Sequence, residues 1–166
     1  MIIFINGSIN AGKSTVAKIL AGELENTALL EIDSLRDMIG WMPIEQAIPI
    51  NLENAILLIK NFSKRGLNVI IPYPLSQKNY DYVMGSLNEL ETKIHIFTLA
   101  PRLEKALTNR GNRELDDWER QRINHHYNIG IHNPSFGEII DNSDQTPKET
   151  AEQILIKIDH TVSFGK

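Results

Sequence analysis

The chain has 166 residues, enough for one domain with a substantial core, and its 42% hydrophobic and 23% charged residues are ordinary for a soluble globular protein. It has no cysteine, which excludes a disulfide framework and thiolate chemistry, and its formal charge of −4 gives no overall signature of nucleic-acid binding. No apolar run approaches a membrane span and no secretory leader opens the sequence. We therefore expect a cytoplasmic protein without a nucleic-acid or membrane partner.

The first half of the chain alternates short apolar runs with apolar residues at helical spacing. Glycine and proline mark several of the boundaries between these segments, as they commonly do at strand and helix ends. The expected elements are, in order, a strand over 1–6, a helix over 14–25, a strand over 28–32, a helix start at 33–37, an apolar connection punctuated by prolines over 41–50, a helix over 51–65, a strand over 67–71 and a helix over 77–90.

The second half continues the alternation, with a strand over 93–99, a short helix over 102–109, a polar glycine-containing segment over 110–117, a helix over 118–131, a strand over 136–140, a helix over 147–159 and a frayed tail over 161–166. Strands that alternate with helices predict an α/β domain, here spanning 1–160, with a parallel sheet covered on both faces. Right-handed crossovers place the carboxyl ends of all strands at one edge, so the residues that follow the strands should rim one cleft.

The stretch over residues 7–15 reads G-S-I-N-A-G-K-S-T, which matches the phosphate-binding loop pattern G-x-x-x-x-G-K-[ST] between a strand and a helix. Glycines permit a backbone that turns several amides toward phosphate oxygens, and the following helix adds its positive end. The lysine contacts the β- and γ-phosphates, and the first hydroxyl can bind Mg²⁺. The sequence therefore predicts a nucleoside triphosphate site formed by Gly7, Asn10, Ala11, Gly12, Lys13, Ser14 and Thr15.

Asp33 follows the second expected strand and should face this loop across the cleft. Its carboxylate could take a proton from a substrate hydroxyl, or bind Mg²⁺ together with Ser14. The same residue could instead cap the helix that begins there. Arg36, one turn further on, could bind an anionic group of the acceptor or lie in solvent.

Arginines flank the polar segment that follows the fourth strand. Mobile arginines stabilise the charge that develops during phosphoryl transfer, and a glycine-containing segment between two helices suits a lid that excludes water. We expect such a lid over about 110–120, with Arg113 and Arg120 as catalytic candidates. The alternative is a salt-bridged surface in which acidic neighbours neutralise the cluster, whose members are Arg102, Arg110, Arg113, Arg120 and Arg122.

The third expected strand runs into Pro72 rather than into an acidic residue, so it lacks the carboxylate that often binds the metal in nucleotide-binding proteins. This leaves Ser14 and Asp33 as the metal-binding candidates. Trp41 and Tyr73 could form the wall of an acceptor pocket or pack under loops. We interpret Asp141 as a loop or capping residue, and the histidines at 125, 126 and 132 as surface or core residues.

These features resemble the small-molecule kinases of the P-loop group, which include shikimate kinase, gluconate kinase and chloramphenicol phosphotransferase. The resemblance spans about residues 1–160 and rests on the phosphate loop, Asp33, the arginine-bearing segment and the closing residues 139–149. The segment that contains Asp33 is most similar to chloramphenicol phosphotransferase, in which the matching aspartate is the proposed base. The glycine triplet of shikimate kinases is absent after the third strand.

The resemblance implies a three-layer α/β/α fold with a five-stranded parallel sheet of order 2-3-1-4-5 and an arginine-bearing lid. It places adenine near Ser143 and Gln145 in the loop after the last strand. It also implies that Arg110 packs on the base and that Arg113 or Arg120 meets the phosphates.

Together, the residues and the resemblance predict a kinase that uses ATP and Mg²⁺ to phosphorylate a hydroxyl of a small molecule. A nucleoside or nucleotide kinase is the alternative enzyme, because Arg36 and the basic lid would suit a phosphorylated acceptor. A nucleotide-dependent switch without an acceptor reaction is a third possibility. The sequence leaves the acceptor and the oligomeric state open.

Overall fold

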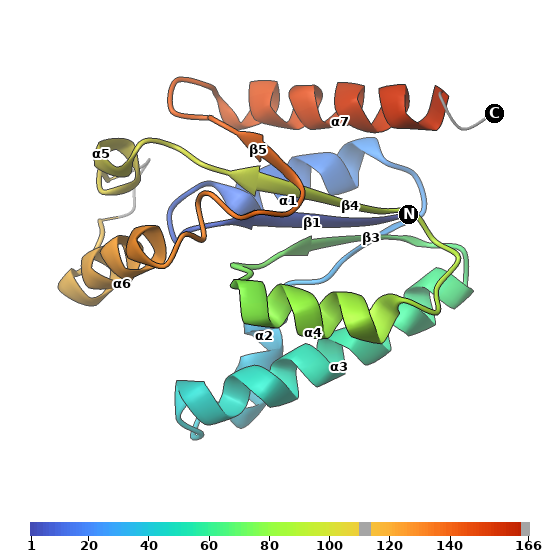
Figure 1. Cartoon of the computed structure of the whole chain (residues 1–166), viewed down its shortest axis with the longest axis horizontal. Helices are drawn as coiled ribbons and strands as arrows, with labels where there is room; N and C mark the ends of the chain where they lie inside the picture. Colours follow the sequence, from blue (N-terminus) through green and yellow to red (C-terminus); the bar gives the residue numbers. More distant parts are fainter. Residues whose placement is uncertain (110–113, 164–166) are drawn as a thin grey trace.

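The structure is a computed structural model and describes residues 1–109 and 114–163. It confirms the expected fold class: a five-stranded sheet has the order β2-β3-β1-β4-β5, and its neighbouring strands are all parallel (Figure 1). The described elements are β1 Ile2–Gly7, α1 Lys13–Glu23, β2 Thr27–Leu29, α2 Ile32–Arg36, the 3-10 helix η1 Asp37–Ile39, α3 Ile44–Lys64, β3 Asn68–Pro72, α4 Gln77–Leu87, β4 Ile94–Leu99, α5 Leu103–Ala106, α6 Asp117–Asn128, β5 Glu138–Ile140 and α7 Pro147–Ser163.

The central strand β1 is buried along its whole length, which explains its unbroken apolar run. Ile2 and Phe4 belong to a core shared with α3 and α4, whereas Ile3 and Ile5 belong to a second core shared with α1 and α7. Figure 1 shows these two helix layers on opposite faces of the sheet. Side chains of successive strand residues point to opposite faces, so a single strand contributes to both cores.

The second strand is shorter than the sequence predicted. β2 ends at Leu29, and Ile32, which was expected in the strand, is buried as the first residue of α2. The N-cap of α2 is Glu31, so the capping alternative for Asp33 is wrong, and Asp33 lies inside the first turn with its side chain exposed. The early start of α2 therefore leaves the Asp33 carboxylate available for other interactions.

The segment over 41–50 is not the irregular connection that its prolines suggested. Helix α3 begins at Ile44 and contains Pro49, and the preceding proline, Pro43, is its N-cap. A proline within a helix leaves the carbonyl four residues before it without an amide partner. Pro49 and Glu45 are both exposed, so water can take the place of that partner. The buried face of α3 then outweighs the lost bond, since it places Ala47, Asn51, Leu52, Ala55, Ile56 and Ile59 against the core.

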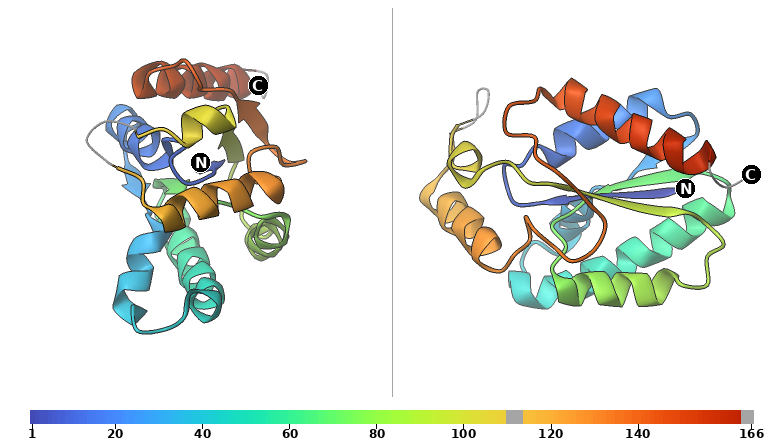
Figure 2. Two further views of the ribbon diagram at one scale, coloured as in Figure 1. Left: turned by 90° about the vertical axis from the view of Figure 1, so that its left-hand side faces the viewer. Right: turned by 45° about the horizontal axis from the view of Figure 1, so that its top comes forward.

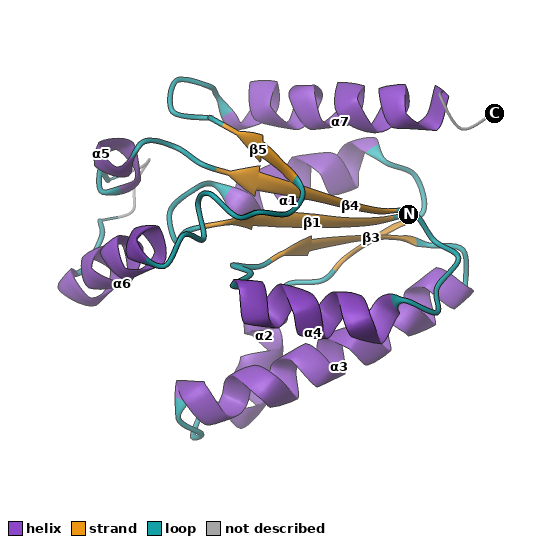
Figure 3. Ribbon diagram, viewed as in Figure 1, coloured by secondary structure: helices purple, strands orange, loops and turns teal. Residues whose placement is uncertain are grey.

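The last third of the chain supplies the elements that approach the phosphate loop. α6 is stabilised at its start by a capping box, in which Asp116 and Glu119 each bond to the other's backbone amide. α7 extends to Ser163, and residues 164–166, part of the expected frayed tail, lie outside the described residues. Figure 3 shows the loops of this region beside the carboxyl ends of β1 and β4.

The carboxyl ends of the strands meet at one edge of the sheet, as expected. The phosphate loop, α5 and α6 lie at this edge, and the left view of Figure 2 shows α6 crossing in front of it. None of the helices within residues 1–109 and 114–163 is long and apolar enough to cross a membrane.

Candidate active site

The loop between β1 and α1 has the backbone that a phosphate cradle requires. Gly7 and Gly12 adopt φ angles of 136° and 95°, and a Cβ on Gly7 would stand 2.4 Å from the carbonyl oxygen of Leu99. Gly12 is the N-cap of α1 and has no side chain to bond the first-turn amides. These amides can therefore bind an anion at the positive end of the helix.

Lys13 opens α1 and folds back over the loop. Its Nζ donates a hydrogen bond to the carbonyl oxygen of Ser8 at 2.7 Å, and the side chain is half-buried. Burial lowers the pKa of Lys13 to about 8, and the nearby carboxylate of Asp33 opposes this shift. The ammonium thus lies in a weakly solvated position where a phosphate would interact strongly with it.

Two asparagine side chains join the loop to the carboxyl-terminal half of the chain, one from the loop itself and one from beyond β5. Asn10, with a φ of 61°, donates from Nδ2 to the carbonyl oxygens of Ala106 and Thr108 at 2.8 and 2.9 Å. Asn142, which follows β5, donates from Nδ2 to the carbonyl oxygen of Ala11 at 2.9 Å. Asn10, predicted to bind the nucleotide, thus uses its side chain to join the loop to the end of α5.

His126 on α6 makes a third contact with the phosphate loop, which the sequence did not reveal. Its Nδ1 lies 3.3 Å from Ser8 Oγ and 3.4 Å from the amide nitrogen of Ile9. The ring is 4% exposed. The interpretation as a core residue fits its burial but missed the contact, because Ser8 lies 118 positions away along the chain and no local pattern links the two.

Tyr73 lies within electrostatic reach of both Asp33 and Arg122. Tyr73 follows β3 and is 6% exposed. Burial raises the pKa of Tyr73 to about 12, the Asp33 carboxylate adds to the increase, and Arg122 opposes it. Since Asp33 also raises the pKa of Lys13, the structure brings together three of the residues predicted for the site, namely Lys13, Asp33 and Tyr73.

The side chains expected to bind a divalent cation carry a hydroxyl, in Ser14, and a carboxylate, in Asp33. Ser14 and Asp33 are both exposed at the edge of the sheet where the carboxyl ends of the strands meet, and oxygen donors suit Mg²⁺. Among the described residues, no group of three or more His, Cys, Asp or Glu side chains could hold a metal ion. These side chains therefore fit a cation that shares its coordination with phosphate oxygens and water, as Mg²⁺ does in nucleotide sites.

Of the arginines in the expected lid, the structure describes Arg120, which makes two hydrogen bonds. Arg110 and Arg113 lie outside the described residues. Arg120 donates to the carbonyl oxygen of Leu107 at 2.8 Å and to Asn109 Oδ1 at 3.4 Å. Its guanidinium thus joins α6 to the residues just before the expected lid.

Two further arginines of the cluster have opposite environments. Arg102 forms ion pairs with Asp144 at 2.8 Å and Glu104 at 3.2 Å, so the salt-bridge alternative holds for this residue. Arg122 is half-buried, acts on Tyr73 and His126, and has no ion pair with another described residue. Among the described arginines of the cluster, Arg122 is therefore the one without a hydrogen bond or an ion pair to another described residue.

The loop after β5 is held by its own side chains. The Ser143 hydroxyl donates to Asp141 and accepts the amide of Arg102 at 2.8 Å, which agrees with a loop-forming role for Asp141. Gln145 bonds to Gln153 and Thr150 at 2.8 and 3.0 Å. The expected contacts of Ser143 and Gln145 with adenine remain predictions, and in this structure both side chains are used internally.

The residues expected at an acceptor site differ in their burial. Arg36 is half-buried, and its Nε atom has no hydrogen-bond partner among the described residues. Trp41 is 81% exposed and forms no wall of an enclosed pocket. Thr15 is also exposed, on the first turn of α1.

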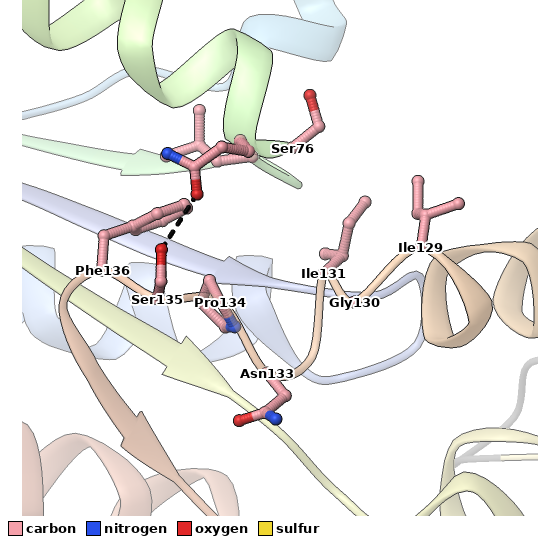
Figure 4. A pocket seen from close by; sticks show the side chains of 10 residues that line it. Ser76, Ile129, Gly130, Ile131, Asn133, Pro134, Ser135 and Phe136 are labelled. Carbon is pink, nitrogen blue, oxygen red and sulfur yellow. Dashed lines mark hydrogen bonds between the residues drawn. The ribbon is translucent and has the colours of Figure 1, made fainter.

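A pocket of about 170 Å³ opens near the end of β3 (Figure 4). Its sides come from the start of α4 and from the loop between α6 and β5, which are joined by a 3.1 Å bond from Ser135 to Gln77. Asn6, next to the phosphate loop, contacts both sides of this pocket. Its Oδ1 accepts from the Leu75 amide and its Nδ2 donates to the Ile131 carbonyl oxygen. None of the described residues that line the pocket is charged.

Comparisons with solved structures match nearly the whole chain. The tunicamycin resistance protein of Deinococcus radiodurans is 21% identical over 95% of this chain and 94% of its own, with a TM-score of 0.66. The APS kinase of Mycobacterium tuberculosis in complex with AMPPNP and APS is 15% identical over 95% and 96%, with a TM-score of 0.73. Shikimate kinase from Aquifex aeolicus is 17% identical over the full length of both chains, with a TM-score of 0.60.

The chain has the fold of the P-loop small-molecule kinases. The expected fold group is thereby confirmed, with the strand order that the resemblance implied. No protein-family model matches the sequence, and a search of curated proteins finds no match. At these identities, the likeness to P-loop kinases establishes the fold, and the chemistry has to be argued from the site.

Proposed function

We propose that this P-loop protein is an ATP-dependent phosphotransferase that phosphorylates a hydroxyl group of a small molecule. One observation carries the proposal: Asp33 lies close enough to Lys13 to raise its pKa. A cation suited to the phosphates of the donor and a carboxylate suited to the acceptor therefore lie close together at one edge of the sheet.

In the proposed reaction, Asp33 takes the proton of the acceptor hydroxyl. The acceptor oxygen forms its bond to the γ-phosphorus while the bond from that phosphorus to the bridging oxygen breaks, and ADP leaves with the electron pair. Asp33 is suited to this task because it is exposed on the first turn of α2 and is not occupied as a helix cap.

The phosphate loop would bind and orient the donor. Lys13 would turn from the carbonyl of Ser8 to the phosphates, and the amides at the start of α1 would bond to their oxygens. Ser14 would hold Mg²⁺, which when bound neutralises charge on the phosphate oxygens, and Asp33 would be its second ligand only if it does not act as the base. Among the arginines, we propose Arg113, as expected from the sequence, and Arg122 as the residues that meet the transferring phosphate, because the Arg120 guanidinium is already bonded to Leu107 and Asn109.

The acceptor would lie between α2 and the end of β3, against Arg36 and Tyr73. The uncharged pocket beside Leu75 adjoins this region and suits a neutral part of the acceptor. A nucleoside or nucleotide kinase is the second candidate, and the unpartnered Nε of Arg36 favours it, because a phosphate would supply the missing partner.

A screen for ADP release in the presence of Mg-ATP tests the proposal. The panel should contain neutral hydroxylated metabolites, nucleosides and nucleoside monophosphates. Stimulation by a hydroxylated metabolite supports the leading candidate, and stimulation by nucleosides or their monophosphates supports the second. Tight ATP binding with no stimulation by any acceptor would instead indicate a nucleotide-dependent switch.

A further inference from the structure

His126 is the buried side chain in contact with the phosphate loop whose role the proposed chemistry does not explain. It lies on α6, the helix that follows the expected lid, and its Nδ1 is 3.4 Å from the Ile9 amide nitrogen and 3.3 Å from Ser8 Oγ. The Ile9 side chain packs against a small cluster of Ala106, Leu115 and Ile123 from the same region. The first part of the phosphate loop is thus held through both its backbone and a side chain.

The hydrogen-bond pattern determines the form of the imidazole. A backbone amide can only donate, so the Nδ1 that faces Ile9 must carry no proton, and the ring proton is on Nε2. Burial, with smaller contributions from the positive charges of Arg122, Lys13 and His125, lowers the pKa of His126 to about 4. A neutral ring is therefore the stable form near pH 7.

The contact of His126 with Ser8 and Ile9 holds the phosphate loop next to a residue with an uncommon backbone conformation. Asn10, the next residue after Ile9, has a φ of 61°, a left-handed conformation that asparagine tolerates better than most residues but that is uncommon outside glycine. The loop from Ser8 to Asn10 therefore depends on outside contacts, and His126 supplies one just before Asn10 bonds to α5. A site held in its binding conformation before the ligand arrives loses less entropy on binding.

We propose that His126 is a positioning residue for the phosphate loop, acting through Ser8 and Ile9 to hold the loop in the conformation that binds nucleotide phosphates. The inference rests on the proposed nucleotide-binding function and adds a residue from α6 to it. His126 does not touch the phosphates in this account, so its loss should weaken nucleotide binding and leave the rate of the bound complex largely unchanged.

The test compares ATP binding and ADP release in the wild type and three variants, in the presence of Mg²⁺. His126→Phe keeps a ring but removes the acceptor, His126→Asn keeps an acceptor near the position of Nδ1, and His125→Phe is the control at the exposed neighbour. We expect His126→Phe to raise the Kd and KM for ATP about tenfold, with kcat within about twofold. His126→Asn and His125→Phe should stay near the wild type.

A second measurement does not depend on the stability of a variant. The nitrogen NMR spectrum of labelled histidine should show His126 as a neutral ring protonated on Nε2, both in the free protein and with ATP bound. A charged ring or one protonated on Nδ1 would overturn the inference, as would an unchanged ATP Kd in a folded His126→Phe variant. Failure of the wild type to bind ATP would overturn the proposed function instead.

Discussion

Asn142 and Ala11 are joined by a hydrogen bond across 131 positions of the chain, with Asn142 Nδ2 donating to the Ala11 carbonyl oxygen at 2.9 Å. Asn142 is 4% exposed and lies two residues beyond β5. Because a carbonyl oxygen repels phosphate, a bond that holds it aside helps the amides of the loop to face the ligand. The last strand of the sheet therefore takes part in shaping the phosphate loop.

Replacing Asn142 with alanine should destabilise the protein, because it leaves the buried Ala11 carbonyl without its partner. We expect the free energy of unfolding to fall by about 1–3 kcal/mol and the Kd for ATP to rise several-fold. Urea unfolding and ATP titration measure the two effects. Asn54→Ala, at an exposed position on α3, is the control and should change neither quantity appreciably. Equal behaviour of the two variants would contradict a role for the bond.

ATP affinity should weaken at alkaline pH because of Lys13. The pKa of Lys13 is about 8 in the free protein, and bound phosphates would raise it. Above pH 8, binding must therefore take up a proton, and the Kd should increase toward about tenfold per pH unit. Titrations of ATP between pH 7 and 10 measure this dependence.

Lys13→Arg is the control for this prediction, since a guanidinium stays charged throughout that range. The variant should bind ATP less tightly at pH 7 but with little change up to pH 10. A wild-type Kd that remains constant from pH 7 to 10 would contradict a titrating Lys13 in the site.

Features encoded by neighbouring residues could be predicted from the sequence, whereas contacts between residues far apart in the chain could not. The phosphate loop, β1 and the face of α3 over residues 51–65 are encoded locally, by glycine spacing and by apolar periodicity. The start of α3 was missed because Pro49 ordinarily ends a helix, and the packing of Ala47 outweighs that local preference. The contacts of His126 with Ser8 and of Asn142 with Ala11 form only in the folded chain, and no short sequence pattern predicts them.

Arg120 and Arg122 should respond differently to removal. The Arg120 guanidinium bonds to the Leu107 carbonyl and Asn109, so Arg120→Ala should lower the free energy of unfolding by about 1–2 kcal/mol. Arg122 has no ion pair with another described residue and lies near Tyr73, so Arg122→Ala should lower acceptor-dependent kcat by about tenfold or more. Thermal unfolding and steady-state kinetics separate the effects. A larger kinetic loss from Arg120→Ala would return the catalytic role to Arg120, as first expected from the sequence.

His126 should also make the protein less stable in acid. Its pKa is about 4 in the folded state against 6.5 ordinarily, so the unfolded chain binds more protons between these values. Stability conferred by the neutral ring is complete above pH 6.5 and declines as the pH falls, by about 3 kcal/mol at pH 4. The free energy of unfolding should therefore fall more steeply between pH 7 and 4 in the wild type than in His126→Asn, as unfolding curves of the two proteins would show. Parallel pH dependence in the two proteins would contradict a buried neutral His126.

In the proposed reaction, Asp33 takes the proton of the acceptor hydroxyl while Lys13 and the phosphate loop hold ATP. The most direct measurement is acceptor-stimulated ADP release by the wild type and Asp33→Asn, with the ATP Kd determined for both. We expect Asp33→Asn to bind ATP within a few-fold of the wild type but to lose the stimulation by about 10²–10⁴-fold. Normal acceptor-dependent turnover by Asp33→Asn would contradict the proposed role of Asp33.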